Sequence, residues 1–283
     1  MIKICAFADE AARSLEEQIE ALKRNKVKYL ELRAVNGTGV SSITVEDATE
    51  YAKILKENGI EVYSIGSPIG KVDVSVDFDK YLEDITHIFR LAKIFGTDKI
   101  RMFSFYNAYG ERDRVIDYLR RIVAKAKEYG LELYHENEKG IYGDVAERVI
   151  DILDNVPGLK SVYDPANFLQ VGEEAGKTLD LLHSRTDYFH IKDVEVATGH
   201  LLPAGEGDGK IEELIRRIEG DTVLTVEPHL AVFDGYASLD KTEMKHKHIF
   251  ESKGAAFDAA VGALRNLLLK AGYSENNFEF KKG

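Results

Sequence analysis

The chain has 283 residues, 44% of them hydrophobic, which is enough for one large core of the size that single-domain α/β barrels have. Acidic residues outnumber basic ones by 49 to 38, and this excess makes a nucleic-acid partner unexpected, because phosphate binding needs clustered Lys and Arg. A single cysteine, Cys5, excludes an intramolecular disulfide. No apolar run has membrane-spanning length or the form of a signal-peptide core, so we expect no membrane partner and a cytoplasmic location.

Short runs rich in Val, Ile, Tyr and Phe recur along the chain and predict eight strands. They cover residues 2–8, 28–33, 61–67, 99–105, 132–136, 159–164, 188–192 and 222–227. Helical patterns separate them; residues 112–129, for example, carry apolar side chains at i, i+4, i+7 and i+11. A final helix is expected near residues 254–271, followed by a short C-terminal tail.

Helix-boundary residues agree with this alternation of strands and helices. Thr44 followed by Asp47 is typical of a helix start, and glycines follow several periodic segments where a left-handed C-cap is wanted. These glycines are Gly59, Gly96, Gly130, Gly220 and Gly272. Eight strand-helix units without a low-complexity linker favour a (β/α)8 TIM barrel over a doubly wound sheet, as one domain spanning residues 1–283.

Three connections that follow predicted strands are long. They comprise residues 68–77, 193–209 and 230–253. In a TIM barrel, loops that follow strands gather at the C-terminal mouth, where active sites lie, and long loops in compact domains are usually functional. We therefore expect the active site at this mouth.

Four residues of metal-ligating type lie near the ends of consecutive predicted strands: Glu136, Asp164, His190 and Glu227. They are 28, 26 and 37 residues apart, about one βα unit each, so they can come from neighbouring parallel strands. Side chains alternate along a strand, which gives Lys192 the same direction as His190 and makes His135 face away from the barrel lumen. His135 is therefore expected to be structural.

Six sequence segments carry a resemblance to the xylose isomerase-like family of TIM barrels, the sugar phosphate isomerases and epimerases. They are YLELR (29–33), YHEN (134–137), YDPANF (163–168), HIKD (190–193), GEGD (205–208) and VEPH (226–229). The resemblance covers essentially the whole chain in order. It implies that Glu136, Asp164, His190 and Glu227 hold one divalent cation.

Three carboxylates and one imidazole form an oxygen-rich ligand set that suits Mn²⁺ best, with Mg²⁺, Co²⁺ or Zn²⁺ as alternatives. Such a cation can polarise the carbonyl of a sugar and stabilise the enediolate formed when the neighbouring C–H loses its proton. In the ketose epimerases of the family, two glutamate ligands accept and donate that proton. The resemblance implies Glu136 and Glu227 for these catalytic roles.

Four further residues are candidates for substrate binding: Lys192, Asn167, Arg33 and His229. Lys192 could instead form a salt bridge with a neighbouring acid. Some epimerase relatives carry a His where this chain has Asn167, which argues against a ketose 3-epimerase in particular. For Arg101, we expect a buried ion pair with Glu31.

The expected function is a divalent-metal-dependent isomerase or epimerase of a sugar or sugar derivative. The alternatives are a metal-dependent dehydratase of a cyclic polyol or keto acid, or a non-catalytic sugar-binding barrel. An abasic-site endonuclease fits poorly, since the chain is acidic and lacks additional His at most strand ends. The expected partner is a small carbohydrate, and a homo-oligomer is compatible with these patterns.

Overall fold

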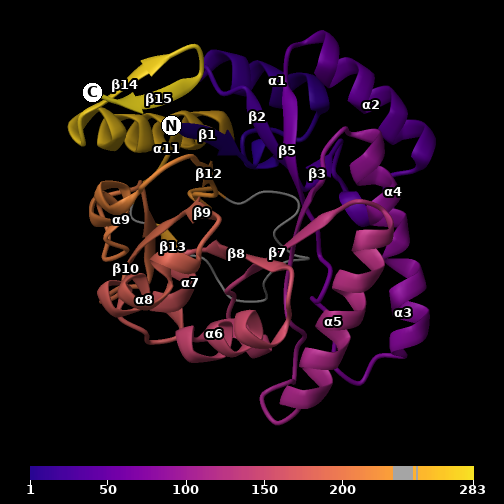
Figure 1. The fold of residues 1–283 in the computed structure, drawn as a ribbon. Coiled ribbons are helices and arrows are strands. Elements are labelled where there is room, and N and C mark those ends of the chain that lie inside the picture. Colours follow the sequence, from indigo (N-terminus) through magenta and orange to yellow (C-terminus); the bar gives the residue numbers. More distant parts are fainter. Residues whose placement is uncertain (232–244, 247) are drawn as a thin grey trace.

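A closed ring of eight parallel strands forms the centre of the molecule (Figure 1). The structure is a computed structural model and describes residues 1–231, 245–246 and 248–283. Each strand of the ring pairs with the next one along the chain, and the last strand closes the ring by pairing with the first, from Ile2 opposite Thr222 to Ala6 opposite Val226. The ring consists of β1 (Ile2–Ala6), β2 (Tyr29–Leu32), β5 (Glu61–Gly66), β6 (Lys99–Met102), β7 (Glu132–Glu136), β8 (Leu159–Tyr163), β9 (Tyr188–Ile191) and β12 (Thr222–Val226). The predicted (β/α)8 barrel is confirmed.

Helices lie outside this ring and cover its outer face (Figure 1). The side chain of Thr44 accepts a hydrogen bond from the backbone N–H of Asp47, as predicted for a helix start, and the five predicted C-cap glycines all have positive φ. The described helices are α1 (Leu15–Arg24), α2 (Val45–Glu57), α3 (Phe78–Asp84), α4 (Thr86–Ile94), α5 (Arg112–Glu128), α6 (Ala146–Asn155), α7 (Pro165–Gln170), α8 (Ala175–Leu182), α9 (Ile211–Arg217) and α11 (Lys253–Lys270). None of them is both long and apolar enough to cross a membrane.

The C-terminal tail is a β-hairpin, a feature that the sequence patterns did not predict. Its strands β14 (Tyr273–Asn276) and β15 (Glu279–Lys282) are antiparallel, and β15 also pairs with the start of β1, where Ile2 lies opposite Phe280. Asn277 and Phe278 both have positive φ, as the two central residues of a type I′ turn require. The hairpin lies beside α11 and extends the barrel sheet (Figure 1).

Short elements surround the mouth of the barrel. Asp193 organises the glycine-rich segment there: its carboxylate accepts hydrogen bonds from the backbone N–H groups of Gly205, Gly207 and Gly209. Most of the predicted loop 230–253 lies outside the described residues. Short strands and 3-10 helices complete the chain: β3 (Ala34–Val35), β4 (Thr38–Gly39), β10 (Asp193–Glu195), β11 (His200–Leu202), β13 (Lys245–His246), η1 (Ala8–Glu10), η2 (Val40–Ser42), η3 (Tyr142–Asp144) and η4 (His183–Arg185).

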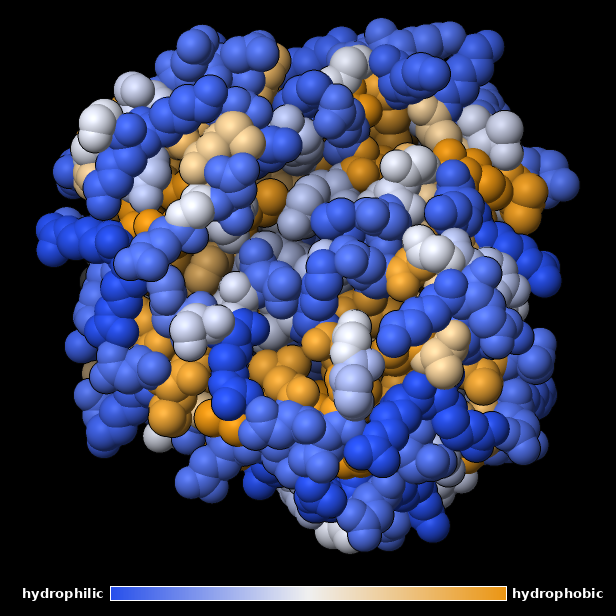
Figure 2. All heavy atoms as spheres, viewed as in Figure 1, coloured by the Kyte–Doolittle hydropathy of each residue, from blue (hydrophilic) through white to orange (hydrophobic). Residues whose placement is uncertain are grey.

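Side chains that point into the lumen form two layers. The lower layer is a buried cluster near the N-terminal ends of the strands, formed by Cys5, Tyr29, Tyr134, Val162, Tyr188 and Val223. The upper layer, nearer the mouth, is charged and is described below. The outer surface differs from both, since Figure 2 shows a face covered mostly by hydrophilic residues with separate hydrophobic patches between them.

Candidate metal centre

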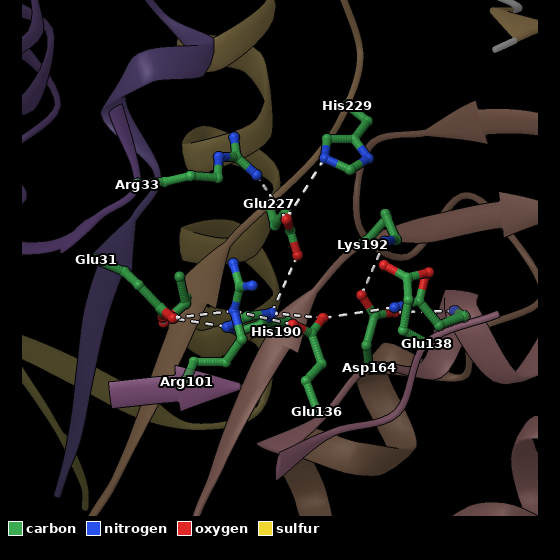
Figure 3. A network of polar contacts seen from close by, with 12 residues as sticks. Glu31, Arg33, Arg101, Glu136, Glu138, Asp164, His190, Lys192, Glu227 and His229 are labelled. Atoms are coloured by element: carbon green, nitrogen blue, oxygen red, sulfur yellow. Dashed lines mark hydrogen bonds and ion pairs between the residues drawn. The ribbon is translucent and has the colours of Figure 1, made fainter. Parts of the chain in front are cut away.

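The four predicted ligand residues converge at the mouth of the barrel (Figure 3). Glu136 is the last residue of β7, His190 lies in β9, and Asp164 and Glu227 directly follow β8 and β12. One ligand atom from each of the four residues lies within 4.8 Å of those of the others, and all four side chains are buried. Strands that neighbour one another in the ring thus bring together residues that are far apart in the sequence.

His190 is the centre of this group. Its Nδ1 lies 2.9 Å from Oε1 of Glu136 and 3.0 Å from Oε2 of Glu227, while its Nε2 lies 3.1 Å from Oε2 of Glu31. Burial alone would lower the pKa of His190, but the charges of Glu136 and Glu31 raise this pKa well above its ordinary value. Without a cation, the imidazolium form of His190 therefore balances part of the carboxylate charge.

Glu136 and Glu227 each use their second carboxylate oxygen to pair with a buried arginine. Nε of Arg101 lies 3.1 Å from Oε2 of Glu136, and Nη1 of Arg33 lies 2.8 Å from Oε1 of Glu227. The expected pair between Arg101 and Glu31 is present at 3.8 Å, so the contact with Glu136 is the closer one. The two proposed catalytic residues are thus held in matching environments.

Arg33 also binds two carboxylates of η1, the short 3-10 helix that comes after β1. It pairs with Asp9 at 2.9 Å and with Glu10 at 3.2 Å. Burial would lower the pKa of Arg33, but Asp9, Glu10 and Glu227 raise it. Burial raises the pKa of Glu10 to about 8, against the opposing effect of Arg33. Arg33 thus lies in an internal ion network, and its role in substrate binding stays a prediction.

Lys192 forms the salt bridge that was its alternative role, with Nζ 2.9 Å from Oδ2 of Asp164. Burial raises the pKa of Asp164 to about 7; Lys192 opposes this rise, and the nearby carboxylates of Glu136 and Glu227 add to it. A second lysine at the mouth, Lys71, pairs with Glu138 at 3.1 Å. Both lysines are thus neutralised by carboxylates.

Asn167 and His229 also lie beside the proposed ligands. The side-chain amide of Asn167 donates to the backbone oxygen of Asn137 at 2.9 Å and lies 3.4 Å from Oε1 of Glu136. The backbone N–H of His229, a residue with positive φ, donates to Oε2 of Glu10 at 2.8 Å. Its Nε2 lies 3.5 Å from Oε1 of Glu227, and burial lowers the pKa of His229 to about 4.

Sequence reasoning missed several members of this network. Asp9 and Glu10 follow β1 at the same end of the barrel as the ligands, and that position was the signal that could have identified them. For Glu31 the sequence predicts only an arginine partner, whereas the structure also places its carboxylate beside Nε2 of His190. His135 points out of the lumen, as strand parity predicted, and its Nε2 lies 3.0 Å from Oγ of Ser104.

The residues present fit a divalent cation. Oδ2 of Asp164 and Oε2 of Glu227 are buried and accept no well-aligned hydrogen bond from the described residues, although Lys192 and His190 lie at ion-pair distance. Buried carboxylate oxygens without such bonds are costly unless something else neutralises them. Three carboxylates and an imidazole can hold Mn²⁺, Mg²⁺, Co²⁺ or Zn²⁺.

A cavity of about 350 Å³ lies beside this centre. Arg33 and Asp9 line it, and Gln18, Ser41 and Ser42 add polar groups to its wall. Its volume falls in the range of small-molecule sites. The cavity is therefore a candidate for the part of a substrate that extends away from the cation.

The chain belongs to the xylose isomerase-like TIM barrel family, whose model matches residues 19–243. The sequence matches no curated protein. Similar solved structures include the probable 3-DHS dehydratase AsbF of Bacillus anthracis, with 18% identity, a TM-score of 0.71, and coverage of 94% of this chain and 99% of that one. A D-allulose 3-epimerase from Methylomonas sp. has 15% identity and a TM-score of 0.72, with 94% and 98% covered.

The third similar structure is that of the IOLI protein, which contains a bound zinc atom. It has 15% identity and a TM-score of 0.70, with 95% of this chain and 99% of that chain covered. At these identities, the three proteins share the fold with this chain. Two of these proteins are a probable dehydratase and an epimerase, so the shared fold does not select one reaction.

Proposed function

We propose that the protein is a divalent-metal-dependent isomerase or epimerase of a sugar or sugar derivative, with Mn²⁺ as the best-matched cation. The observation that carries the proposal is the paired arrangement of Glu136 and Glu227, each with one oxygen toward Nδ1 of His190 and the other on a buried arginine. When bound, a divalent cation supplies Lewis-acid polarisation of a substrate carbonyl. The two glutamates then act as proton acceptor and proton donor.

The charges around Glu227 suit a proton acceptor that stays ionised. Burial raises its pKa, but Lys192 and His190 outweigh burial and hold the pKa well below the ordinary range. Arg101 provides a comparable positive charge beside Glu136. One glutamate, as the carboxylate, removes a proton from the hydroxyl-bearing carbon next to the carbonyl and gives an enediolate. The other glutamate, in its protonated form, then donates its own proton, either to the opposite face of the same carbon, which inverts it, or to the former carbonyl carbon, which moves the carbonyl.

The charge balance at the mouth favours an uncharged carbohydrate. Within the described part of the chain, each basic side chain of the network is paired with a carboxylate: Lys71 with Glu138, Lys192 with Asp164, Arg101 with Glu136, and Arg33 with Asp9, Glu10 and Glu227. A phosphate group on the substrate would have to compete with these carboxylates for the same lysine and arginine side chains. Asn167, Arg33, His229 and Lys192 remain our candidates for contacts with the substrate.

Hydrogen exchange tests the proposed reaction. Candidate ketoses and aldoses are incubated in deuterated water with the Mn²⁺-loaded protein, and incorporation of deuterium at one carbon is followed by NMR. We expect exchange with at least one sugar and its loss in Glu227→Gln. A sugar that binds to the loaded protein but shows no exchange and no conversion would contradict proton-transfer catalysis.

A dehydratase is the second candidate, and the position of Lys192 favours it. This lysine is 4% exposed and lies beside Asp164, where its ammonium group can donate a hydrogen bond to a departing hydroxyl. Asn167, at the place where some epimerases carry a His, is also compatible with dehydration. An enone product detected by ultraviolet absorbance would decide for this reaction, and zero turnover across a broad sugar panel would favour a sugar-binding protein.

A further inference from the structure

Glu31 is a buried carboxylate in the middle of the barrel that is not among the proposed metal ligands. Its side chain is fully buried on β2, and placing a charge there is costly unless it is well partnered. The hydroxyl of Tyr188 donates to Oε1 at 3.1 Å, and the hydroxyl of Thr225 donates to Oε2 at 3.1 Å. Side chains from two other strands thus hold the carboxylate in one orientation.

The same carboxylate faces the side of His190 that points away from the proposed cation. Oε2 of Glu31 lies 3.1 Å from Nε2, whereas Glu136 and Glu227 approach Nδ1 on the opposite side of the ring (Figure 3). The ring of Phe7 packs edge-on against the imidazole, with centroids 5.2 Å apart and planes at 85°. The position and the rotation of the imidazole are therefore both fixed.

An ionised carboxylate accepts hydrogen bonds and donates none. Nε2 must therefore carry its proton to bond with Glu31, and in neutral His190 this leaves the lone pair of Nδ1 directed toward Glu136 and Glu227. Metal-binding histidines commonly donate their second N–H to a carboxylate, which sets the tautomer and makes the ligand more basic.

We propose that Glu31 is the positioning residue of the metal centre: through Nε2 of His190 it selects the tautomer that presents Nδ1 to the cation. This inference rests on the proposed metal-dependent function. Glu31 acts through His190 and contacts neither cation nor substrate. Its removal should therefore weaken metal binding before any sugar is present.

The test measures Mn²⁺ affinity by isothermal titration calorimetry. Glu31→Leu removes the acceptor, and Glu31→Gln keeps a carbonyl oxygen for Nε2. Glu138→Gln removes another carboxylate of the mouth, a half-buried one whose ion-pair partner is Lys71. Loss of such a partner typically weakens metal binding by about 10–100-fold, which is the effect expected for Glu31→Leu. The Mn²⁺ affinity should fall less in Glu31→Gln, and it should fall least in Glu138→Gln.

A second readout follows the nitrogens of His190 directly. In ¹⁵N NMR spectra of the Zn²⁺-loaded wild-type protein, Nε2 should carry the proton and Nδ1 should show the shift of a metal-bound nitrogen. If Glu31→Leu does not fold, Glu31→Gln still serves, because the Nε2–H shift should move toward that of an imidazole bonded to a neutral acceptor.

Several outcomes would overturn the inference. One is equal Mn²⁺ affinity of the Glu31 variants and Glu138→Gln, because loss of negative charge alone would then explain the effect. Another is a Zn²⁺-loaded wild-type protein with its proton on Nδ1, or an unchanged Nε2–H shift in Glu31→Gln. Either result would leave the proposed function intact as long as the wild-type protein binds metal; a wild-type protein that binds neither Mn²⁺ nor Zn²⁺ would remove both proposals.

Discussion

The two layers of the lumen are built by the same strands and have opposite chemistry. On β7, Tyr134 lies in the lower layer and Glu136 in the upper one, and on β9 the corresponding residues are Tyr188 and His190. A rise of two residues, roughly 6–7 Å, thus changes the lumen from packed tyrosine rings to a network of charges. The rings of Tyr134 and Tyr188 meet at a centroid distance of 5.4 Å, an edge-on contact that stabilises the fold without any ligand.

This difference distinguishes the part of the lumen that holds the barrel together from the part that we propose binds a cation. In the upper layer, carboxylates outnumber their basic partners, and the surplus suits a divalent cation. Substitutions in the lower layer should therefore change stability alone, except at Tyr188, whose hydroxyl donates to Glu31. Those in the upper layer should change activity, metal binding and stability in a metal-dependent way.

The largest effect is expected for Glu227→Gln in the upper layer. Loss of the proton acceptor should lower turnover by about 10²–10⁴-fold, as is typical of a general acid or base. The thermal midpoint of the metal-free protein should change little, since Arg33 keeps Asp9 and Glu10 as partners. The measurement is turnover of the sugar found by deuterium exchange, with circular dichroism as the control for folding. Unchanged turnover at saturating metal would disprove the assigned role.

Arg101→Met should cost about 3–5 kcal/mol of unfolding free energy in the metal-free protein, because buried Glu136 and Glu31 lose a positive partner. Added Mn²⁺ should recover part of this loss. Urea denaturation in the presence of EDTA measures the loss of unfolding free energy, and the same experiment with Mn²⁺ measures the recovery. The matched control is Arg24→Met, which breaks an exposed pair with Asp258 and should cost no more than about 1 kcal/mol. Equal losses in the two variants would mean that the upper layer does not depend on charge compensation.

Val162→Ala tests the lower layer. The side chain is 1% exposed among the tyrosines, and removal of two carbon atoms should cost about 2 kcal/mol of unfolding free energy. Mn²⁺ affinity, measured by calorimetry, should match that of the wild-type protein. A clear drop in affinity would show that the two layers are coupled and that their separation is too simple.

The last prediction concerns His135, which belongs to neither layer and affects stability only as the pH falls below its ordinary pKa. Burial lowers its pKa to about 3, against about 6.5 in an unfolded chain. The unfolded state therefore binds the additional proton, so the stabilisation is present above about pH 6.5 and is lost as pH falls toward 3, by up to about 1.4 kcal/mol per pH unit. His135→Gln can keep the bond to Ser104 and should flatten this part of the curve of unfolding free energy against pH. Identical slopes for variant and wild type would contradict a neutral buried His135.

The sequence predicted the barrel because periodicity and glycine C-caps are local signals. The four proposed ligands could also be found, since each lies at or next to the end of a strand and strand parity gives the direction of its side chain. The pairing of charges could not be predicted in the same way. Arg33 is on the same strand face as Glu31, yet it binds Asp9, Glu10 and Glu227, because in a closed barrel the nearest partner across the lumen can come from any strand. The choice of ion-pair partner therefore depends on the three-dimensional arrangement of the strands in the ring.

Closure of the ring also has a consequence for the order of folding. Strand β1 pairs with β12 and with β15 of the terminal hairpin. The pairing of Ile2 with Thr222 and Phe280 therefore cannot form until nearly the whole chain has been made. Contacts between such distant residues close late and slow folding, and a growing chain exposes both edges of its sheet until then. Glu227 follows this last barrel strand, so a nascent chain can hold three of the four proposed ligands but cannot assemble the full set until the barrel is nearly complete.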